Sequence, residues 1–197
     1  MARVYTMCQI CASCAYTDLW VSCINSPMTK IIDYLKEGVE FVPAVVGFMV
    51  RDNQVLLGLR KKVSLGLGEN LISGIGGKVG DHPEFAKENP DQALVREFQE
   101  EVGVTPTVFE KCGRVRFIFP DKPKWSQEVD IYRITKWQGV PRETESISPV
   151  WFEQNNLPKM RMWEDNVYWV PLVLRGESVE MVFLYGENNQ IVEYQEN

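Results

Sequence analysis

Residues 96–104 read Arg-Glu-Phe-Gln-Glu-Glu-Val-Gly-Val and place three glutamates on one short predicted helix. On a helix, Glu97, Glu100 and Glu101 are separated by three or four residues, so they share one face. Like charges this close repel each other, and the usual partner that offsets the repulsion is a hard divalent cation. Carboxylate oxygens suit Mg²⁺ and also Mn²⁺. The stretch therefore predicts a helix that carries a divalent-cation site.

The residues on either side mark the limits of this helix. Asn89 is suited to cap the N-terminus, Pro90 to the first helical position, and Asp91 to the positive end of the helix dipole. Gly103 suits the left-handed conformation that often ends a helix. Between these limits the residues of one apolar face are Ala93, Leu94, Phe98 and Val102. We expect a helix over 90–102 that packs this face on a core and leaves the glutamates on another.

The rest of the chain alternates apolar, β-branched runs with turn residues, a pattern typical of strands and hairpins. Strands are expected over 40–50, 55–59, 71–75, 114–119, 128–137, 149–152, 179–185 and 191–194. A second helix is expected over 164–174, ended by Gly176. Strands mixed with two helices indicate an α/β or α+β fold in which helices cover a sheet.

The composition restricts the class of protein. The chain has 197 residues, a formal net charge of −6 and 45% hydrophobic residues, which fits one globular domain with a sizeable core. The acidic balance argues against a non-specific nucleic-acid binder but not against a nucleotide substrate, because a bound metal inverts the local charge. No apolar run is long enough to span a membrane. We expect a cytoplasmic monomer that acts on a small molecule, without direct contact to nucleic acid or membrane.

Four of the five cysteines lie near the N-terminus, namely Cys8, Cys11, Cys14 and Cys23. A disulfide framework would spread its cysteines over the fold, so we interpret the main domain as reduced. The spacing is one that a zinc or iron–sulfur site uses. The alternative is a poorly ordered leader, or translated sequence ahead of a start at Met28. We expect a cysteine-rich extension over 1–27 and the main domain over 28–197.

A longer pattern surrounds the glutamate helix. Gly77 is followed downstream by Glu88, by seven further residues and then by the 96–104 stretch. This string resembles the Nudix box of the nucleoside diphosphate-X hydrolases, which implies an α/β/α sandwich with a mixed central sheet. The family has five residues between the glycine and the first glutamate, whereas this chain has ten, 78–87. We interpret the difference as a loop insertion, which leaves either Glu84 or Glu88 as the first glutamate.

The resemblance also implies how the site works. Metal binding falls to Glu97, Glu100, Glu101 and the backbone carbonyl of Gly77, while Arg96 orients the carboxylates. The metal neutralises the phosphates, and one of the glutamates or a metal-bound hydroxide activates the attacking water. The products implied are a nucleoside monophosphate and pyrophosphate.

A second segment, Met-Trp-Glu-Asp-Asn-Val-Tyr-Trp-Val-Pro over 162–171, resembles the base-recognition segment of family members that hydrolyse oxidised purine nucleoside triphosphates. By this resemblance Trp163 stacks on a purine, and Asp165 and Asn166 hydrogen-bond its edge. Those members have a second aspartate in place of Asn166 and an asparagine in place of Ser73. Both changes alter the donors and acceptors that the base would meet.

Other side chains near these motifs have two interpretations each. Phe117 forms either a hydrophobic wall of the base pocket or part of the core. Of two candidate phosphate contacts we favour Lys78, which adjoins the metal turn, and interpret Arg60 as a solvated strand end. A further downstream acid is supplied by Glu143 or Glu145, or both are solvated loop charges.

Three hypotheses for function follow. The first is an Mg²⁺-dependent hydrolase that clears oxidised purine nucleoside triphosphates, such as 8-oxo-dGTP, from the nucleotide pool. The second keeps the enzyme class and changes the substrate to another nucleoside diphosphate-X compound. The third is a non-catalytic nucleotide sensor, which is disfavoured because the box keeps all of its carboxylates.

Overall fold

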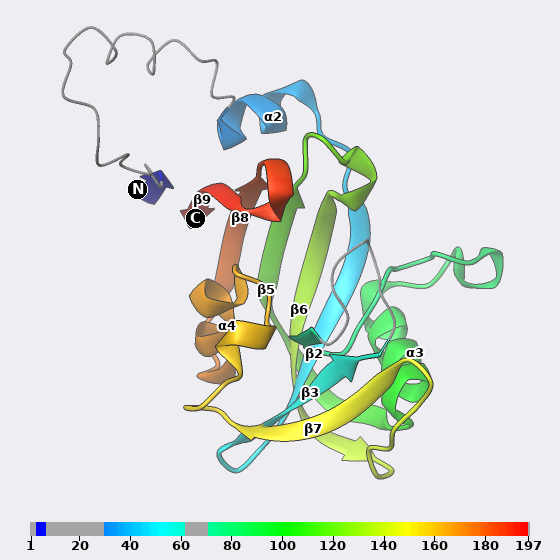
Figure 1. Cartoon of the computed structure of the whole chain (residues 1–197). Helices are drawn as coiled ribbons and strands as arrows, with labels where there is room; N and C mark the ends of the chain where they lie inside the picture. The colour runs from blue at the N-terminus through cyan, green and yellow to red at the C-terminus, as the bar shows by residue number, and fades with distance from the viewer. Residues whose placement is uncertain (1–2, 7–29, 62–70, 197) are drawn as a thin grey trace, which may run out of the picture.

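The protein, seen in a computed structural model, is described for residues 3–6, 30–61 and 71–196. In this part nine strands form one mixed sheet in the order β1-β9-β8-β5-β6-β2-β3-β4, and β7 pairs with β3 (Figure 1). The strands are β1 (Arg3–Thr6), β2 (Val42–Arg51), β3 (Gln54–Arg60), β4 (Ile72–Ser73), β5 (Thr105–Ile118), β6 (Gln127–Gln138), β7 (Ile147–Glu153), β8 (Val179–Tyr185) and β9 (Ile191–Glu196). The helices are α2 (Ile31–Glu37), α3 (Pro90–Val102) and α4 (Asn166–Leu174). The pairs β2–β6 and β5–β8 are parallel and the others are antiparallel.

Helices α3 and α4 cover opposite faces of the sheet, and β2 contributes side chains to both (Figure 1). Successive side chains of a strand point to opposite faces. Val45 and Met49 of β2 pack in one hydrophobic core with Phe98 of α3. Phe48 belongs to the other core, where its ring meets Trp169 of α4 edge to face at a centroid distance of 5.7 Å. The predicted sandwich with a mixed central sheet is confirmed.

Helix α3 begins and ends where the sequence predicts. The side chain of Asn89 accepts a hydrogen bond from the N–H of Gln92 at 3.0 Å, and the side chain of Gln92 accepts one from the N–H of Asn89 at 2.9 Å. Such a reciprocal cap contributes about 1 kcal/mol to helix stability. Gly103 follows the last turn with a φ of 72°, which glycine adopts without a steric penalty. The predicted apolar face is buried.

The structure extends the prediction in two places. Strand β5 begins at Thr105, well before the expected start at 114, because charged residues and a register shift next to Gly113 hide its period. Helix α2 was not predicted; it is short, and its Ile31 is buried against the sheet. The extension cysteines and the expected boundary at residue 28 lie outside the described residues. No helix in the described ranges is long and apolar enough to cross a membrane.

Candidate active site

A glycine turn joins the sheet to the acidic face of α3. The N–H of Val45 in β2 donates to the carbonyl of Gly77 at 2.8 Å and so pins the turn to the sheet. A Cβ atom on Gly77 would lie only 2.3 Å from Oε1 of Glu97. Only glycine therefore lets the backbone approach this carboxylate so closely. The Gly77 carbonyl keeps a second lone pair for a further partner.

Arg96 braces the acidic face with all five of its N–H donors. Its Nε and Nη2 donate to the two oxygens of Glu88 at 3.0 and 2.8 Å, in the bidentate geometry that guanidinium groups favour. Its Nη1 donates to Glu97 at 2.8 Å and to Glu100 at 3.1 Å. Nη2 also donates to the carbonyl of Lys78 at 3.0 Å. One side chain thus fixes three carboxylates relative to the glycine turn.

Glu88, rather than Glu84, takes part in this network. The Glu88 side chain is 8% exposed and also accepts a hydrogen bond from the N–H of Gly80 at 2.8 Å. Its hydrogen bonds with Arg96 hold the pKa of its carboxyl below the usual range. Glu84 is exposed and pairs with His82 in the loop. These contacts favour Glu88 over Glu84 as the first glutamate of the motif.

Two of the remaining carboxylates of α3, Glu97 and Glu101, have raised pKa values because they are buried, although each has an arginine partner. Burial raises the pKa of Glu97, although its hydrogen bond with Arg96 works in the opposite direction. Burial also raises the pKa of Glu101 to about 7, even though Arg60 lies 3.4 Å away. Glu100 is half exposed. A cation placed at this face would favour the charged form of each carboxyl group.

The donor set fits a hard divalent cation. Carboxylate and backbone carbonyl oxygens are the ligands that Mg²⁺ and Mn²⁺ prefer, and both types meet at the turn beside α3. Within the described ranges, acidic, histidine and cysteine side chains do not form a ready-made cluster of three ligands. The carboxylates are instead held by Arg96 and Arg60. The fit therefore rests on the chemistry of the donors and on the close approach of the Gly77 backbone to the Glu97 carboxylate.

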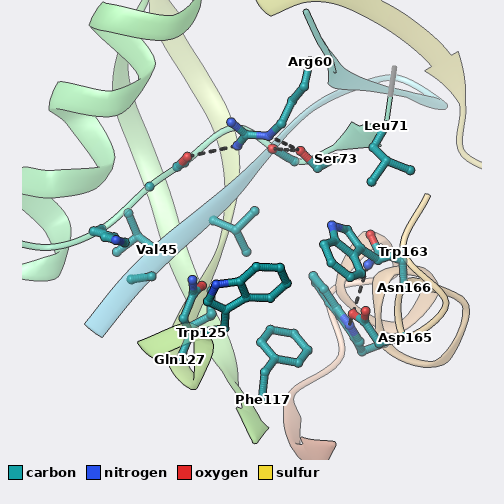
Figure 2. A pocket seen from close by; sticks show the side chains of 18 of the residues that line it. Val45, Arg60, Leu71, Ser73, Phe117, Trp125, Gln127, Trp163, Asp165 and Asn166 are labelled. Atoms are coloured by element: carbon teal, nitrogen blue, oxygen red, sulfur yellow. Dashed lines mark hydrogen bonds between the residues drawn. The ribbon is translucent and has the colours of Figure 1, made fainter. Parts of the chain in front are cut away.

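A cavity of about 310 Å³ opens beside the glycine turn (Figure 2). Gly77 and the side chains predicted to bind substrate all line it, namely Ser73, Lys78, Phe117, Trp163, Asp165 and Asn166. These residues come from segments that are far apart in the sequence. The fold thus brings the predicted base-binding and phosphate-binding residues to one place, next to the acidic face of α3.

Aromatic rings form a large part of the cavity wall. Trp163 lies ahead of α4, and Phe117 and Trp125 lie across the cavity from Asn166 (Figure 2). Phe117 also stacks on Phe183 in the core at a centroid distance of 5.9 Å, so it both lines the cavity and packs in the core. Sequence reasoning missed Trp125. Trp125 also packs on Phe119 at a centroid distance of 5.8 Å, so a tryptophan at this position is equally expected from core packing and its place in the sequence does not point to the cavity.

Asp165 is bound mainly by other groups of the protein. The hydroxyl of Tyr185 donates to its Oδ1 at 2.6 Å, and Nε1 of Trp169 donates to its Oδ2 at 2.7 Å. Nδ2 of Asn166 donates to the same Oδ2 at 3.0 Å. Burial raises the pKa of Asp165 against the effect of these donors. Because Nδ2 of Asn166 faces Asp165, the Oδ1 of Asn166 faces away and is the atom suited to a ligand.

Arg60 links the cavity to α3, and the interpretation as a solvated strand end is wrong. Its guanidinium donates to Oγ of Ser73 at 3.3 Å and to the carbonyl of Gly76 at 3.4 Å (Figure 2). It also donates to Glu101 at 3.4 Å. The end of β3, where Arg60 lies, is at the rim of the cavity. The sequence indicates where this strand ends but not what lies beside its end. Gln127, at the start of β6, is a second cavity residue that sequence reasoning missed.

The two candidates for a downstream acid lie in the loop between β6 and β7. Glu143 is exposed and pairs with Lys61. Glu145 is exposed in the same loop. In the part of the chain that the structure describes, neither residue lines the cavity.

The chain is similar to proteins of one family. Residues 40–173 match the family model described as the NUDIX domain. The chain is 32% identical over 146 residues to an oxidized purine nucleoside triphosphate hydrolase of Danio rerio, which covers 74% of this chain and 88% of that protein. The identity to the protein of the same name from Mus musculus is 30%, with the same coverage. The crystal structure of a mutator MutT protein from Bacillus halodurans has a TM-score of 0.67 at 18% identity, and covers 80% of this chain and 98% of that one.

Proposed function

Because the chain belongs to the NUDIX family of hydrolases, we propose that it hydrolyses oxidised purine nucleoside triphosphates such as 8-oxo-dGTP. The products are the nucleoside monophosphate and pyrophosphate. One observation carries the proposal: the braced carboxylates of α3 and the aromatic cavity meet at the Gly77 turn. A nucleotide whose base occupies the cavity has its phosphates at this turn. The names of the two animal relatives support the same substrate class.

The acidic face of α3 is the proposed site of a divalent cation. NUDIX hydrolases generally use divalent metal ions. In this chain we assign Mg²⁺, with Mn²⁺ as a substitute, to Glu97, Glu100, Glu101 and the carbonyl of Gly77. When bound, the cation supplies positive charge to the phosphates and makes a neighbouring water more acidic.

The residues of the chain then have distinct roles in the reaction. Arg96 keeps the carboxylates in fixed positions, which lowers the entropic cost of bringing water and phosphate together. One of the α3 glutamates removes a proton from the attacking water as the bond between the α- and β-phosphates breaks, which releases the nucleoside monophosphate and pyrophosphate. Lys78 and Arg60, which both line the cavity, contact the phosphates and offset their charge.

The cavity selects the base by stacking and by hydrogen bonds. Trp163 and Trp125 offer ring faces for a purine, since stacking on an aromatic side chain contributes about 1–3 kcal/mol per base. Asn166 and Ser73 present polar groups to its edge. A base that leaves such a buried group unpaired binds less well, so the extra polar group of an oxidised purine is distinguished. Asp165 supports this selection by fixing the amide of Asn166.

A second candidate keeps the reaction and changes the base. Gln127 adds an amide to the cavity wall, while Asn166 is an amide that does not change its protonation state. The Gln127 amide both donates and accepts, so it matches more than one pattern of base edge, while Asn166 offers its Oδ1 as a fixed acceptor. These two side chains favour a broader range of purine triphosphates, or another nucleoside diphosphate-X substrate.

A panel of nucleotides tests both candidates. Rates are measured with Mg²⁺ for 8-oxo-dGTP, dGTP, dATP, ADP-ribose and a nucleotide sugar. We expect kcat/KM for 8-oxo-dGTP to exceed that for dGTP by at least about tenfold, the scale that one pocket contact supports. Equal values for oxidised and normal triphosphates would favour the second candidate. Absence of turnover across the panel would reject both.

A further inference from the structure

We propose that Phe85, in the inserted loop before α3, is a positioning residue that covers the face of Arg96 and keeps the α3 carboxylates ready for a cation. The inference rests on the proposed role of these carboxylates. Within 81–87, Phe85 is half-buried, whereas its neighbours are exposed. A loop that otherwise faces solvent thus turns one aromatic ring inward.

Backbone hydrogen bonds fix the path of the chain on both sides of Phe85. The N–H of Phe85 donates to the carbonyl of His82 at 2.9 Å, and the N–H of Glu88 donates to the carbonyl of Phe85 at 2.8 Å. The ends of the loop are joined as well, because the N–H of Gly80 donates to the Glu88 carboxylate. The insertion therefore folds back on the same glutamate that binds Arg96.

The Phe85 ring packs on a face of the Arg96 guanidinium, where the guanidinium makes no hydrogen bonds. All five N–H donors of the guanidinium are used in its own plane, so only its two faces remain. The Cζ of Arg96 lies 4.7 Å from the centroid of the Phe85 ring. Guanidinium faces are weakly hydrated and stack on aromatic rings.

This contact connects the loop to the cation site. The Arg96 side chain is 13% exposed, and it holds both Glu97 and Glu100. If this face of the guanidinium were uncovered, water would reach it. The guanidinium could then move, and water would compete with the carboxylates for its N–H donors. The carboxylates would then need to be reordered when a cation binds, which weakens binding. Phe85 acts through Arg96 and touches neither the cation nor the substrate.

The test compares Phe85→Ala, Phe85→Leu and Phe85→Trp with Lys87→Ala, an exposed control in the same loop. Two readouts are used: the Mn²⁺ dissociation constant without nucleotide, and the solvent exchange rate of the Arg96 Nε proton in metal-free protein by NMR. For Phe85→Ala we expect Mn²⁺ binding about 3–10-fold weaker and faster proton exchange. Phe85→Leu should give an intermediate dissociation constant and exchange rate, and Phe85→Trp should keep both close to the wild-type values. Thermal unfolding of each variant checks that it is folded.

Unchanged Arg96 exchange and unchanged Mn²⁺ binding in Phe85→Ala would overturn the inference. An equal loss in Lys87→Ala would also overturn it, because the effect would then belong to the loop and not to the ring. A wild-type protein that fails to bind Mn²⁺ would instead overturn the proposed function of α3. The exchange rate needs no metal and would still decide whether Phe85 covers Arg96.

Discussion

The acidic face of α3 and the aromatic cavity beside it are built in different ways. The acidic face draws on one short part of the chain, 76–101, and is held together by charge, with Arg96 at its centre. The cavity collects side chains from β2 to β8 and is shaped by aromatic packing. From this difference we propose that chemistry and base choice are separable in this molecule. Changes on α3 should slow every nucleotide alike, whereas changes in the cavity should alter their ranking.

The largest expected effect comes from removing a carboxylate of α3. Glu101→Gln should lower kcat by at least about 100-fold for every nucleotide that is turned over, because a proposed cation ligand is lost. Steady-state rates across the nucleotide panel measure it. Glu110→Gln, an exposed change on β5, is the control and should keep the normal rate. A near-normal rate in Glu101→Gln would remove this residue from the mechanism.

The next effect tests how Arg96 is braced. Glu88→Gln should lower kcat by about 10–100-fold, since the bidentate pair with Arg96 is broken while the loop keeps its length. Glu84→Gln removes a carboxylate from the same loop without touching Arg96 and should leave kcat unchanged. Equal losses in the two variants would show that the loop acts through its net charge and not through the contact between Glu88 and Arg96.

Changes in the cavity should alter kcat/KM and the preference among bases. Trp163→Ala should reduce kcat/KM for the preferred purine by about tenfold, within the range expected for one lost stacking contact. The preference over a poorer base should shrink by a similar factor. Trp137→Ala changes a tryptophan that packs on Trp151 outside the cavity and should keep the ranking. If Trp163→Ala slowed all bases equally, chemistry and base choice would not be separable.

The smallest expected effect is on stability and comes from Asp165. Its pKa is raised by burial, so ionising it costs more in the folded state than in the unfolded chain. Its contribution to stability is therefore complete below the unfolded pKa of about 3.9 and is lost as pH rises through the folded pKa. The stability of the wild type relative to Asp165→Asn should fall over this window, by at most about 1.4 kcal/mol per pH unit. Urea unfolding of both proteins at several pH values measures the difference in their free energies of unfolding. A difference that stays constant with pH would contradict the prediction.

Much of the fold could be predicted because local signals agreed with packing. Asn89 and Gly103 mark α3 by chemistry that acts within a few residues, and the structure keeps both limits. The start of β5 could not be predicted, because its pairing with β6 shifts register next to Gly113 and no local period survives. Helix α2 was missed since one buried residue, Ile31, fixes it to the sheet.

The candidate site also has residues that could be predicted from the sequence and residues that could not. The α3 carboxylates and Arg96 follow a pattern of fixed spacing, so the sequence was sufficient to find them. The choice of Glu88 over Glu84 required the path of an inserted loop. Trp125 and Gln127 join the cavity only through tertiary structure, and nothing in their own neighbourhoods in the sequence indicates that they line it. Arg60 was one of two candidate phosphate contacts, but its position at the cavity depends on where β3 ends in the fold.

The most direct test of the proposed reaction is the identity of the products formed from 8-oxo-dGTP by the wild-type protein with Mg²⁺. Separation of the reaction mixture by ion-exchange chromatography measures them. We expect 8-oxo-dGMP and pyrophosphate in equal amounts, and their loss in Glu101→Gln. Release of 8-oxo-dGDP and inorganic phosphate, or no product at all, would contradict the proposed function.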